Sequence, residues 1–400
     1  MQKSRLFEYS SSSKIHDIEE AISKHISLIT SISIKEGLIG ISLFYYYYYL
    51  FTQDEKYLRQ VSKYLNESID RLHSSQLEVF TQYDLQDLGR YVSFLTNEGL
   101  MSIKEAKMIV KEIDPFVNEL LEKQLAEKNF ESVLGSIGLG YYYLETIPLK
   151  DRNKTLERII EVIDSSGIRH EKDEVFWYFN NELNRNEQKI KSLGATNGQT
   201  GILHFLLQLC QVNIKPSVCK NLISDGVAYM LKYRSSRLPF ISFPDKVDPM
   251  AHISYQSLAY GDIGIGNFLF QYGQAFQMEE YIDLGLEIMA RGALYRDDTG
   301  KYCKDAALLH GASGMFALFE NYSNLSNHLE ICEAALYWYD RIIYFGSLET
   351  EWAGFKTYYN GYDDRFQLTF GYGLAGIGIS LIAHQLKMPP KYLSLINFYV

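Results

Sequence analysis

The stretch LLHGASG at residues 308–314 contains the pattern that decides the fold, G-x-x-G at the start of an apolar run. The segment that follows, GMFALFENY (314–322), is apolar on nearly all sides, which is typical of a helix buried in a protein interior. The same pattern occurs six times, and repetition of this kind indicates an architecture built from one repeated unit. The six copies begin at Gly37, Gly135, Gly198, Gly261, Gly311 and Gly373.

A seventh copy is predicted where the spacing leaves a gap. The first two copies are about twice as far apart as the others, and the midpoint between them falls at QDLG (86–89), which lacks the first glycine. Amphipathic segments lie between the copies, for example at 54–73 and 103–128, and their apolar positions recur every three to four residues. Each repeat therefore pairs one apolar helix with one amphipathic helix.

Seven such pairs predict an all-α fold, a single (α/α)7 double-ring toroid over residues 1–400. A closed double ring suits this alternation because an inner ring of apolar helices can be covered by a second ring. The glycines allow close approach of the backbone and leave free helix N-termini around one mouth of the ring. We expect residues 1–13 to form a flexible N-terminal segment.

The composition is that of a globular protein, with 46% hydrophobic and 22% charged residues. A net charge of −10 disfavours a general nucleic-acid binder, and the longest uncharged run, 37–53, is too short for a membrane span. Its five consecutive tyrosines surround a helix and are expected in the core. No secretory signal is visible, and the cysteines lack C-x-x-C spacing, so we expect reduced thiols in a cytoplasmic protein. These cysteines are Cys210, Cys219, Cys303 and Cys332.

The residues directly before each first glycine should line the mouth. They are Glu36, Leu85, Leu134, Asn197, Tyr260, His310 and Tyr372. Polar groups dominate this set from the fourth copy onward. Any chemistry is therefore expected in the C-terminal half of the chain.

Three segments carry a resemblance to a known family: AYGDIG (259–264), LHGASG (309–314) and FGYGLAGIGISLIAH (370–384). Together with the sevenfold repeat, they resemble the LanC family, the lanthionine cyclases of ribosomally made peptides, over essentially the whole chain. The resemblance implies a toroid in which two cysteines and a histidine bind a zinc ion. In the family, this zinc activates the thiol of a substrate cysteine.

The ligand positions implied by the resemblance are Ala259, Leu309 and His310, so both cysteines are replaced. Protein zinc sites use three or more ligands, and we therefore expect no zinc. A displaced site is the alternative, because His252 and Cys303 stand at the same distance before Ala259 and His310. Without zinc, a substrate thiol keeps a pKa of about 8.5 and is mostly protonated at neutral pH.

Other functional positions of the family are matched only in part. Tyr260 and His310 are matched, Glu131 replaces an aspartate, Asn197 replaces a histidine, and Tyr255 replaces an arginine. The resulting catalytic candidates are His310, Tyr260 and Glu131, and the substrate-binding candidates at the mouth are Asn197, Tyr255, Asp262 and Tyr372. Structural roles compete with these: His310 capping a helix or persisting as a packed remnant, Tyr260 in the aromatic interior, and Asp262 capping a helix N-terminus.

The expected function is a role in lanthipeptide-type maturation without the zinc centre. The protein would bind a precursor or dehydrated peptide in the mouth, as a partner of modifying enzymes such as a dehydratase. It could instead be a zinc-independent cyclase in which His310 and Tyr260 move protons. Two alternatives remain: a carbohydrate-active enzyme pairing Glu131 with Asp84 or Asp87, and an inactive interaction scaffold.

Overall fold

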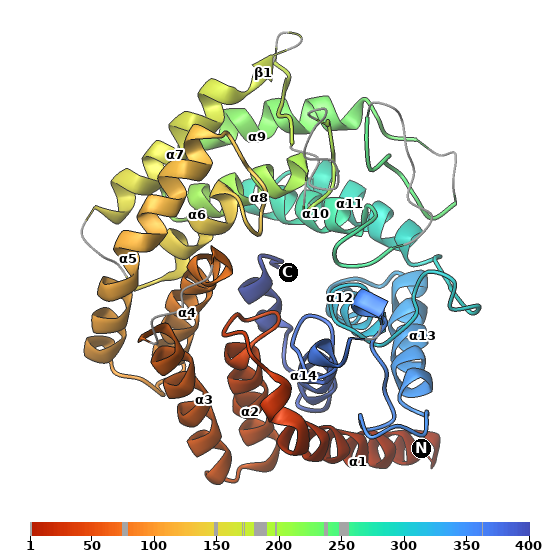
Figure 1. Ribbon diagram of the computed structural model, residues 1–400. Coiled ribbons are helices and arrows are strands. Elements are labelled where there is room, and N and C mark those ends of the chain that lie inside the picture. The colour runs from red at the N-terminus through yellow and green to blue at the C-terminus, as the bar shows by residue number, and fades with distance from the viewer. Residues whose placement is uncertain are drawn as a thin grey trace. The chain divides into compact units, whose positions relative to one another are not determined.

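The computed structural model describes residues 2–73, 79–147, 151–169, 171, 173–179, 190–196, 198–235, 239–247, 256–361 and 363–400. Within these ranges the protein is mostly helical (Figure 1). Seven core helices are α2 (Leu38–Thr52), α4 (Val79–Asn97), α6 (Ser136–Glu145), α8 (Gln199–Gln211), α10 (Ile263–Phe276), α12 (Ala312–Leu325) and α14 (Leu374–Gln385). Seven covering helices are α1 (Gln2–His25), α3 (Lys56–His73), α5 (Ile103–Ala126), α7 (Arg152–Ser166), α9 (Pro216–Leu231), α11 (Glu279–Gly292) and α13 (Leu329–Phe345).

The remaining elements are short. A two-stranded antiparallel sheet pairs β1 (Ile168–Arg169) with β2 (Val175–Phe176), and Ile168 is opposite Phe176. The 3-10 helices are η1 (Ile26–Leu28), η2 (Tyr359–Gly361), η3 (Asp364–Phe366) and η4 (Lys391–Ile396). No helix among the described residues is long and apolar enough to span a membrane.

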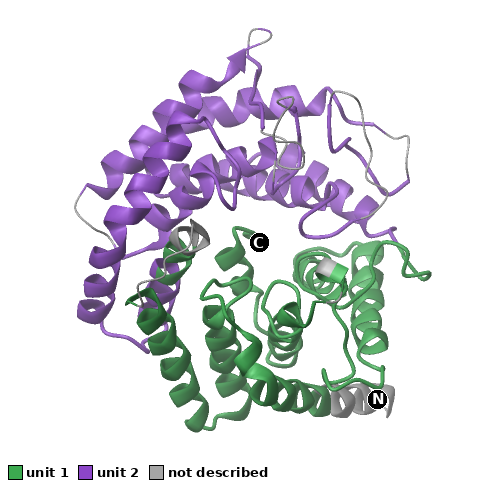
Figure 2. Ribbon diagram, viewed as in Figure 1, with its two compact units in different colours: residues 1–88, 296–400 green, residues 89–295 purple. Residues whose placement is uncertain are grey.

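The contacts divide the chain into two compact units (Figure 2). Unit 1 contains residues 1–88 and 296–400, and unit 2 contains residues 89–295. Helix α4 begins in unit 1 and ends in unit 2. The organisation of residues 1–400 as one domain stays a prediction.

Each unit contains pairs of a core helix and a covering helix. In unit 1, α2 packs on α3, α12 on α13, and α14 on α1. In unit 2, α6 packs on α7, α8 on α9, and α10 on α11. The last core helix, α14, is therefore covered by α1, the first helix of the chain. Sequence order alone does not show that these two helices form a pair.

Helix α1 includes residues 2–13, and the expectation that residues 1–13 form a flexible segment stays a prediction. Ile15, Ile18 and Ile22 recur at helical spacing and are fully buried. Toward the start of the helix, the Ser12 hydroxyl donates to Gln385 Oε1 at the end of α14, at 3.1 Å. From Ser12 onward, α1 is therefore held along α14.

The tyrosine run lies in the core, as the sequence predicts. Tyr45, Tyr46, Tyr47 and Tyr48 are buried, and the hydrophobic surface of α2 extends around the whole helix. The ring of Tyr45 stacks on that of Tyr64 in α3, with the ring centroids 5.6 Å apart. These rings join the core helix to its covering helix.

A recurring loop, called here the glycine loop, precedes five of the core helices. Its polar first residue stands six positions before the first glycine, and its carbonyl accepts the N–H of the first helical residue at 2.8–3.1 Å. In four copies the side-chain oxygen also accepts the N–H of the residue two positions on, at 3.0–3.4 Å, which is the geometry of Asx and Ser/Thr turns. The five residues are Ser31, Asn129, Ser192, Asp305 and Gln367.

Close approach of the backbone explains both glycines of the pattern. A Cβ atom added at Gly311 would lie 2.5 Å from the backbone nitrogen of Ala307. A Cβ atom added at Gly40, the second glycine of the first copy, would lie 2.2 Å from the carbonyl oxygen of Ile34. Both distances are far below van der Waals contact, so only glycine fits these turns.

Two copies depart from this scheme. QDLG (86–89) lies inside α4, which begins at Val79, so the prediction that a helix starts there is wrong. Its glycine serves helix packing instead: a Cβ at Gly89 would lie 2.4 Å from the ring of Tyr142 in α6. In the fifth copy, α10 begins one residue later, at Ile263, and Gly261 adopts a positive φ of 86°.

Candidate functional site

Hydrogen bonds join neighbouring glycine loops within each unit. In unit 1, the Gly371 N–H donates to the Lys35 carbonyl at 2.8 Å, and the Gly371 carbonyl accepts the Leu309 N–H at 3.0 Å. In unit 2, the Ser132 hydroxyl donates to the Thr196 carbonyl, and the Thr196 hydroxyl donates to the Ala259 carbonyl at 3.3 Å. The described site candidates Glu131, His310 and Tyr372 therefore lie on loops that are fixed to neighbouring loops inside their own unit.

His310 lies in an aromatic cluster of unit 1. Its ring is nearly parallel to those of Tyr359 and Tyr372, with centroid distances of 6.2 Å and 5.9 Å. Tyr359 and Tyr372 stack on each other with centroids 3.8 Å apart and planes within 10°. Because His310 is about equally far from both stacked rings, its ring lies beside the pair and not on top of it.

Burial sets the protonation state of His310. Loss of solvent lowers its pKa to about 4, so the imidazole is neutral at physiological pH. Gly311, and not His310, occupies the N-cap position of α12. Any function of His310 therefore depends on its position in the aromatic cluster.

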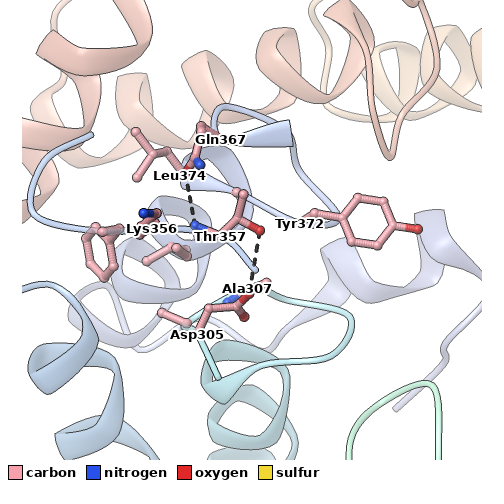
Figure 3. Close-up of a pocket in the computed structure, with 11 residues that line it drawn as sticks. Asp305, Ala307, Lys356, Thr357, Gln367, Tyr372 and Leu374 are labelled. Carbon is pink, nitrogen blue, oxygen red and sulfur yellow. Dashed lines mark hydrogen bonds between the residues drawn. The ribbon is translucent and has the colours of Figure 1, made fainter. Parts of the chain in front are cut away.

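Asp305 and Gln367 hold together the three segments that carry His310, Tyr359 and Tyr372. The Asp305 carboxylate accepts the N–H groups of Tyr358 at 2.7 Å and Ala307 at 3.0 Å, which joins the Tyr359 segment to the loop that carries His310. Gln367 Oε1 accepts the Thr357 N–H at 2.9 Å, and its backbone carbonyl accepts the Leu374 N–H at 2.8 Å. Both side chains line a small cavity, from which the Tyr372 ring points away (Figure 3).

Sequence reasoning missed Tyr359, Asp305 and Gln367. Tyr359 lies in η2, outside every repeat pattern, so nothing in the sequence relates it to His310. Asp305 and Gln367 do carry a signal, the polar residue six positions before the glycine. That signal becomes visible only when the copies are compared upstream of the glycines.

Glu131 supports its own glycine loop. Its carboxylate is buried and accepts the N–H groups of Val133, at 2.9 Å, and Leu134. Glu131 belongs to unit 2, whereas Asp84 and Asp87 belong to unit 1. Burial and the nearby charges of Asp87 and Glu36 raise the pKa of Asp84 to about 8. The contacts of Glu131 favour a structural role, so the carbohydrate-active alternative gains no support from them.

Asp262 occupies the N-cap position of α10, and its carboxylate is engaged elsewhere in the structure. Its side chain is 1% exposed and makes no capping hydrogen bond. The carboxylate accepts the N–H groups of Ser242 and, at 3.2 Å, Phe243, as well as Gln256 Nε2 at 2.8 Å. It therefore joins the segment before α10 to residues 242–243, a long-range role that sequence spacing does not indicate.

Tyr260 and Tyr372 are candidates with different exposure. Tyr260 is 38% exposed in a turn whose backbone N–H donates to the Ser257 hydroxyl at 3.0 Å. Tyr372 is buried in the aromatic cluster. Asn197, Tyr255 and His252 lie outside the described residues. Tyr260 is thus an accessible side chain of unit 2, and Tyr372 a buried one of unit 1.

The residues at the family's zinc positions do not fit the metal. The side chains of Ala259 and Leu309 have no atom that can donate an electron pair to zinc, which leaves His310 as the single side-chain ligand at these three positions. Cys303 is buried, its thiol donates to the Asp305 carbonyl at 3.6 Å, and burial raises its pKa. Among the residues that the structure describes, no three His, Cys, Asp or Glu side chains are grouped to hold a metal ion.

Comparisons with known proteins define the family. Residues 29–393 match the family model described as lanthionine synthetase C-like protein. The solved structure of nisin cyclase is similar, with a TM-score of 0.74 and 13% sequence identity over 96% of both chains. A search of curated proteins gave no match. The structural likeness confirms the predicted all-α toroid fold class, and because the family model covers most of the chain, this protein belongs to the lanthionine synthetase C-like family.

Proposed function

We propose that this protein acts in the maturation of a ribosomally made peptide by binding a precursor or dehydrated peptide, without a zinc centre. The peptide would bind at the glycine loops, where the aromatic cluster around His310 lies. The protein would act in the cytoplasm as a partner of peptide-modifying enzymes such as a dehydratase. Membership of the family supports the general role, and the residues of the site support binding over cyclisation.

The ligand set argues against family-type chemistry. Zinc activates a thiol by stabilising the thiolate, and it needs three or more protein ligands to stay bound. Of the family's three positions, Ala259 and Leu309 supply none, and one imidazole is too weak a ligand set. A substrate thiol would then keep its pKa of about 8.5 and remain mostly protonated.

The observation that carries the proposal is the position of His310 in an aromatic cluster. A general base or acid works best when its pKa lies near the working pH. A pKa of about 4, caused by burial, makes His310 a weak base and leaves almost no protonated form to act as an acid. A neutral imidazole beside two stacked tyrosines is instead suited to contact with a peptide.

The test separates binding from cyclisation in one preparation. The purified protein is analysed for bound metal and then titrated with a dehydroalanine-containing peptide that carries one free cysteine. Affinity is measured by calorimetry, and ring formation by loss of thiol alkylation in mass spectrometry. A peptide of the same composition in scrambled order is the control.

We expect peptide binding, no retained zinc, and a thiol that stays open to alkylation. Stoichiometric zinc together with ring formation would contradict the proposal. Ring formation without metal would point to the zinc-independent cyclase. Absence of binding to any peptide of the set would favour the interaction scaffold.

A further inference from the structure

We infer that Tyr359, stacked on Tyr372, forms a subsite that binds a planar residue of the peptide next to His310. This inference rests on the proposed function and names the chemistry that the site would recognise. The shared chemistry is a flat π-system, present in an aromatic side chain and in the conjugated C=C–C=O group of a dehydrated residue. Tyr359 was absent from every set of candidates drawn from the sequence.

The ring geometry places the other two rings of the cluster at the sides of the Tyr359–Tyr372 stack. Phe366 is nearly perpendicular to both tyrosines, and its centroid lies 4.9 Å from that of Tyr359 and 5.8 Å from that of Tyr372. If the Phe366 ring lay over the outer face of Tyr359, it would be much farther from Tyr372 than from Tyr359, because the two tyrosine centroids are already 3.8 Å apart. Phe366 and His310 therefore both flank the stack, and neither covers the outer face of Tyr359.

The exposure of the rings agrees with this geometry. Tyr372, the inner ring of the stack, is buried, whereas Tyr359 and His310 are partly exposed. A planar group of a bound peptide could lie on the outer face of Tyr359 and extend the stack by one layer. Offset stacking of this kind is the preferred arrangement of aromatic groups.

The subsite is held in place before any ligand binds. The Asp305 carboxylate accepts the backbone N–H of Tyr358 and the side-chain hydroxyl of Thr357, directly before Tyr359, and Gln367 Oε1 accepts the backbone N–H of Thr357. Both side chains are buried, so these hydrogen bonds are shielded from water. A fixed ring loses little conformational freedom on binding, which favours affinity.

The experiment uses the full-length protein and a peptide series of constant sequence. One position at a time is alanine, phenylalanine or dehydroalanine, and affinity is measured by calorimetry. Stacking contributes about 0.5–1.5 kcal/mol beyond simple burial, so we expect the phenylalanine or dehydroalanine peptide to bind about 2- to 10-fold more tightly than the alanine peptide at one position. The two arms tell an aromatic side chain from a dehydrated residue.

Three substitutions test the role of the ring. Tyr359→Phe should keep the preference for a planar residue, and Tyr359→Leu, which stays apolar but is not flat, should abolish it. Tyr344→Ala is the control, because Tyr344 is a 61% exposed tyrosine on covering helix α13. Thermal unfolding of all three variants checks that the fold is intact.

The outcomes distinguish this inference from the proposed function. If the wild-type protein binds no peptide of the series, the proposed function fails. If it binds all three residues equally, or if Tyr359→Leu keeps the preference, the peptide-binding function stands and the Tyr359 subsite is wrong. Loss of the preference in Tyr344→Ala as well would also overturn the assignment.

Discussion

The backbone N–H of Gly371 donates a 2.8 Å hydrogen bond to the carbonyl oxygen of Lys35, which joins the last glycine loop to the first. The carbonyl of the same glycine accepts the Leu309 N–H, so one residue connects three loops of unit 1. The same unit also pairs α14 with α1. Unit 1 is therefore assembled from both ends of the chain, and its stability depends on contacts that are very distant in sequence.

Substitution of Ile18 by alanine should destabilise the protein by about 2–5 kcal/mol, because the side chain is fully buried and leaves a cavity. Ile18 faces α14, where its side chain lies next to Gly378. The measurement is the free energy of unfolding in urea. Ile103→Ala on α5 is the control, since Ile103 is 60% exposed and its loss should change stability by less than about 0.5 kcal/mol. Equal effects of the two substitutions would show that α1 is not docked.

Two glycines of a single loop should respond differently to alanine. A Cβ at Gly198 would lie 2.4 Å from the backbone nitrogen of Gly194, so Gly198→Ala must displace the loop and should destabilise the fold by about 1–3 kcal/mol. A Cβ at Gly194 would meet no atom closer than 3.7 Å, so Gly194→Ala is the matched control. Chemical denaturation of both variants makes the comparison. If Gly198→Ala leaves the free energy of unfolding unchanged, close approach of the backbone does not explain the glycines of the repeat.

Protonation of His310 should make the free energy of unfolding depend on pH. Its pKa of about 4 in the folded protein lies below the ordinary value of 6.5, so the unfolded chain binds a proton first as the pH falls. The stability that depends on neutral His310 is complete above pH 6.5 and is lost progressively toward pH 4, by up to about 3 kcal/mol. His310→Gln should flatten this part of the profile. Direct titration of the imidazole by NMR gives the second measurement, and a midpoint near 6.5 would refute burial.

Asp262 should affect stability and not peptide binding. Asp262→Asn weakens hydrogen bonds to Ser242, Phe243 and Gln256 in a buried site, which should cost about 1–3 kcal/mol. Asp283→Asn on the exposed face of α11 is the control. Unfolding and calorimetric titration are measured on the same samples. Weaker peptide binding by a folded Asp262→Asn protein would return this residue to the substrate-binding candidates.

The repeat could be predicted because its cause is local. Each glycine is required by backbone atoms a few residues away in the same loop, as at Gly40 and Gly311, so the requirement leaves a mark at fixed spacing. The second copy was predicted wrongly because the cause of its glycine is not local. Gly89 is a glycine because of Tyr142, which belongs to another repeat, and no spacing rule separates that cause from a helix start.

For the candidate site, the sequence could predict only which residue types occupy the expected positions. The sequence by itself determined that Ala259, Leu309 and His310 occupy the positions that the family resemblance predicts for the ligands, because such a prediction depends only on residue type and spacing. Only the tertiary structure decided that His310 lies beside Tyr359 and Tyr372, largely withdrawn from solvent, and that Asp262 is turned toward backbone N–H groups. A pKa and a ring stack depend on which side chains exclude water from one another, and those side chains come from segments that are brought together only by packing of the whole chain.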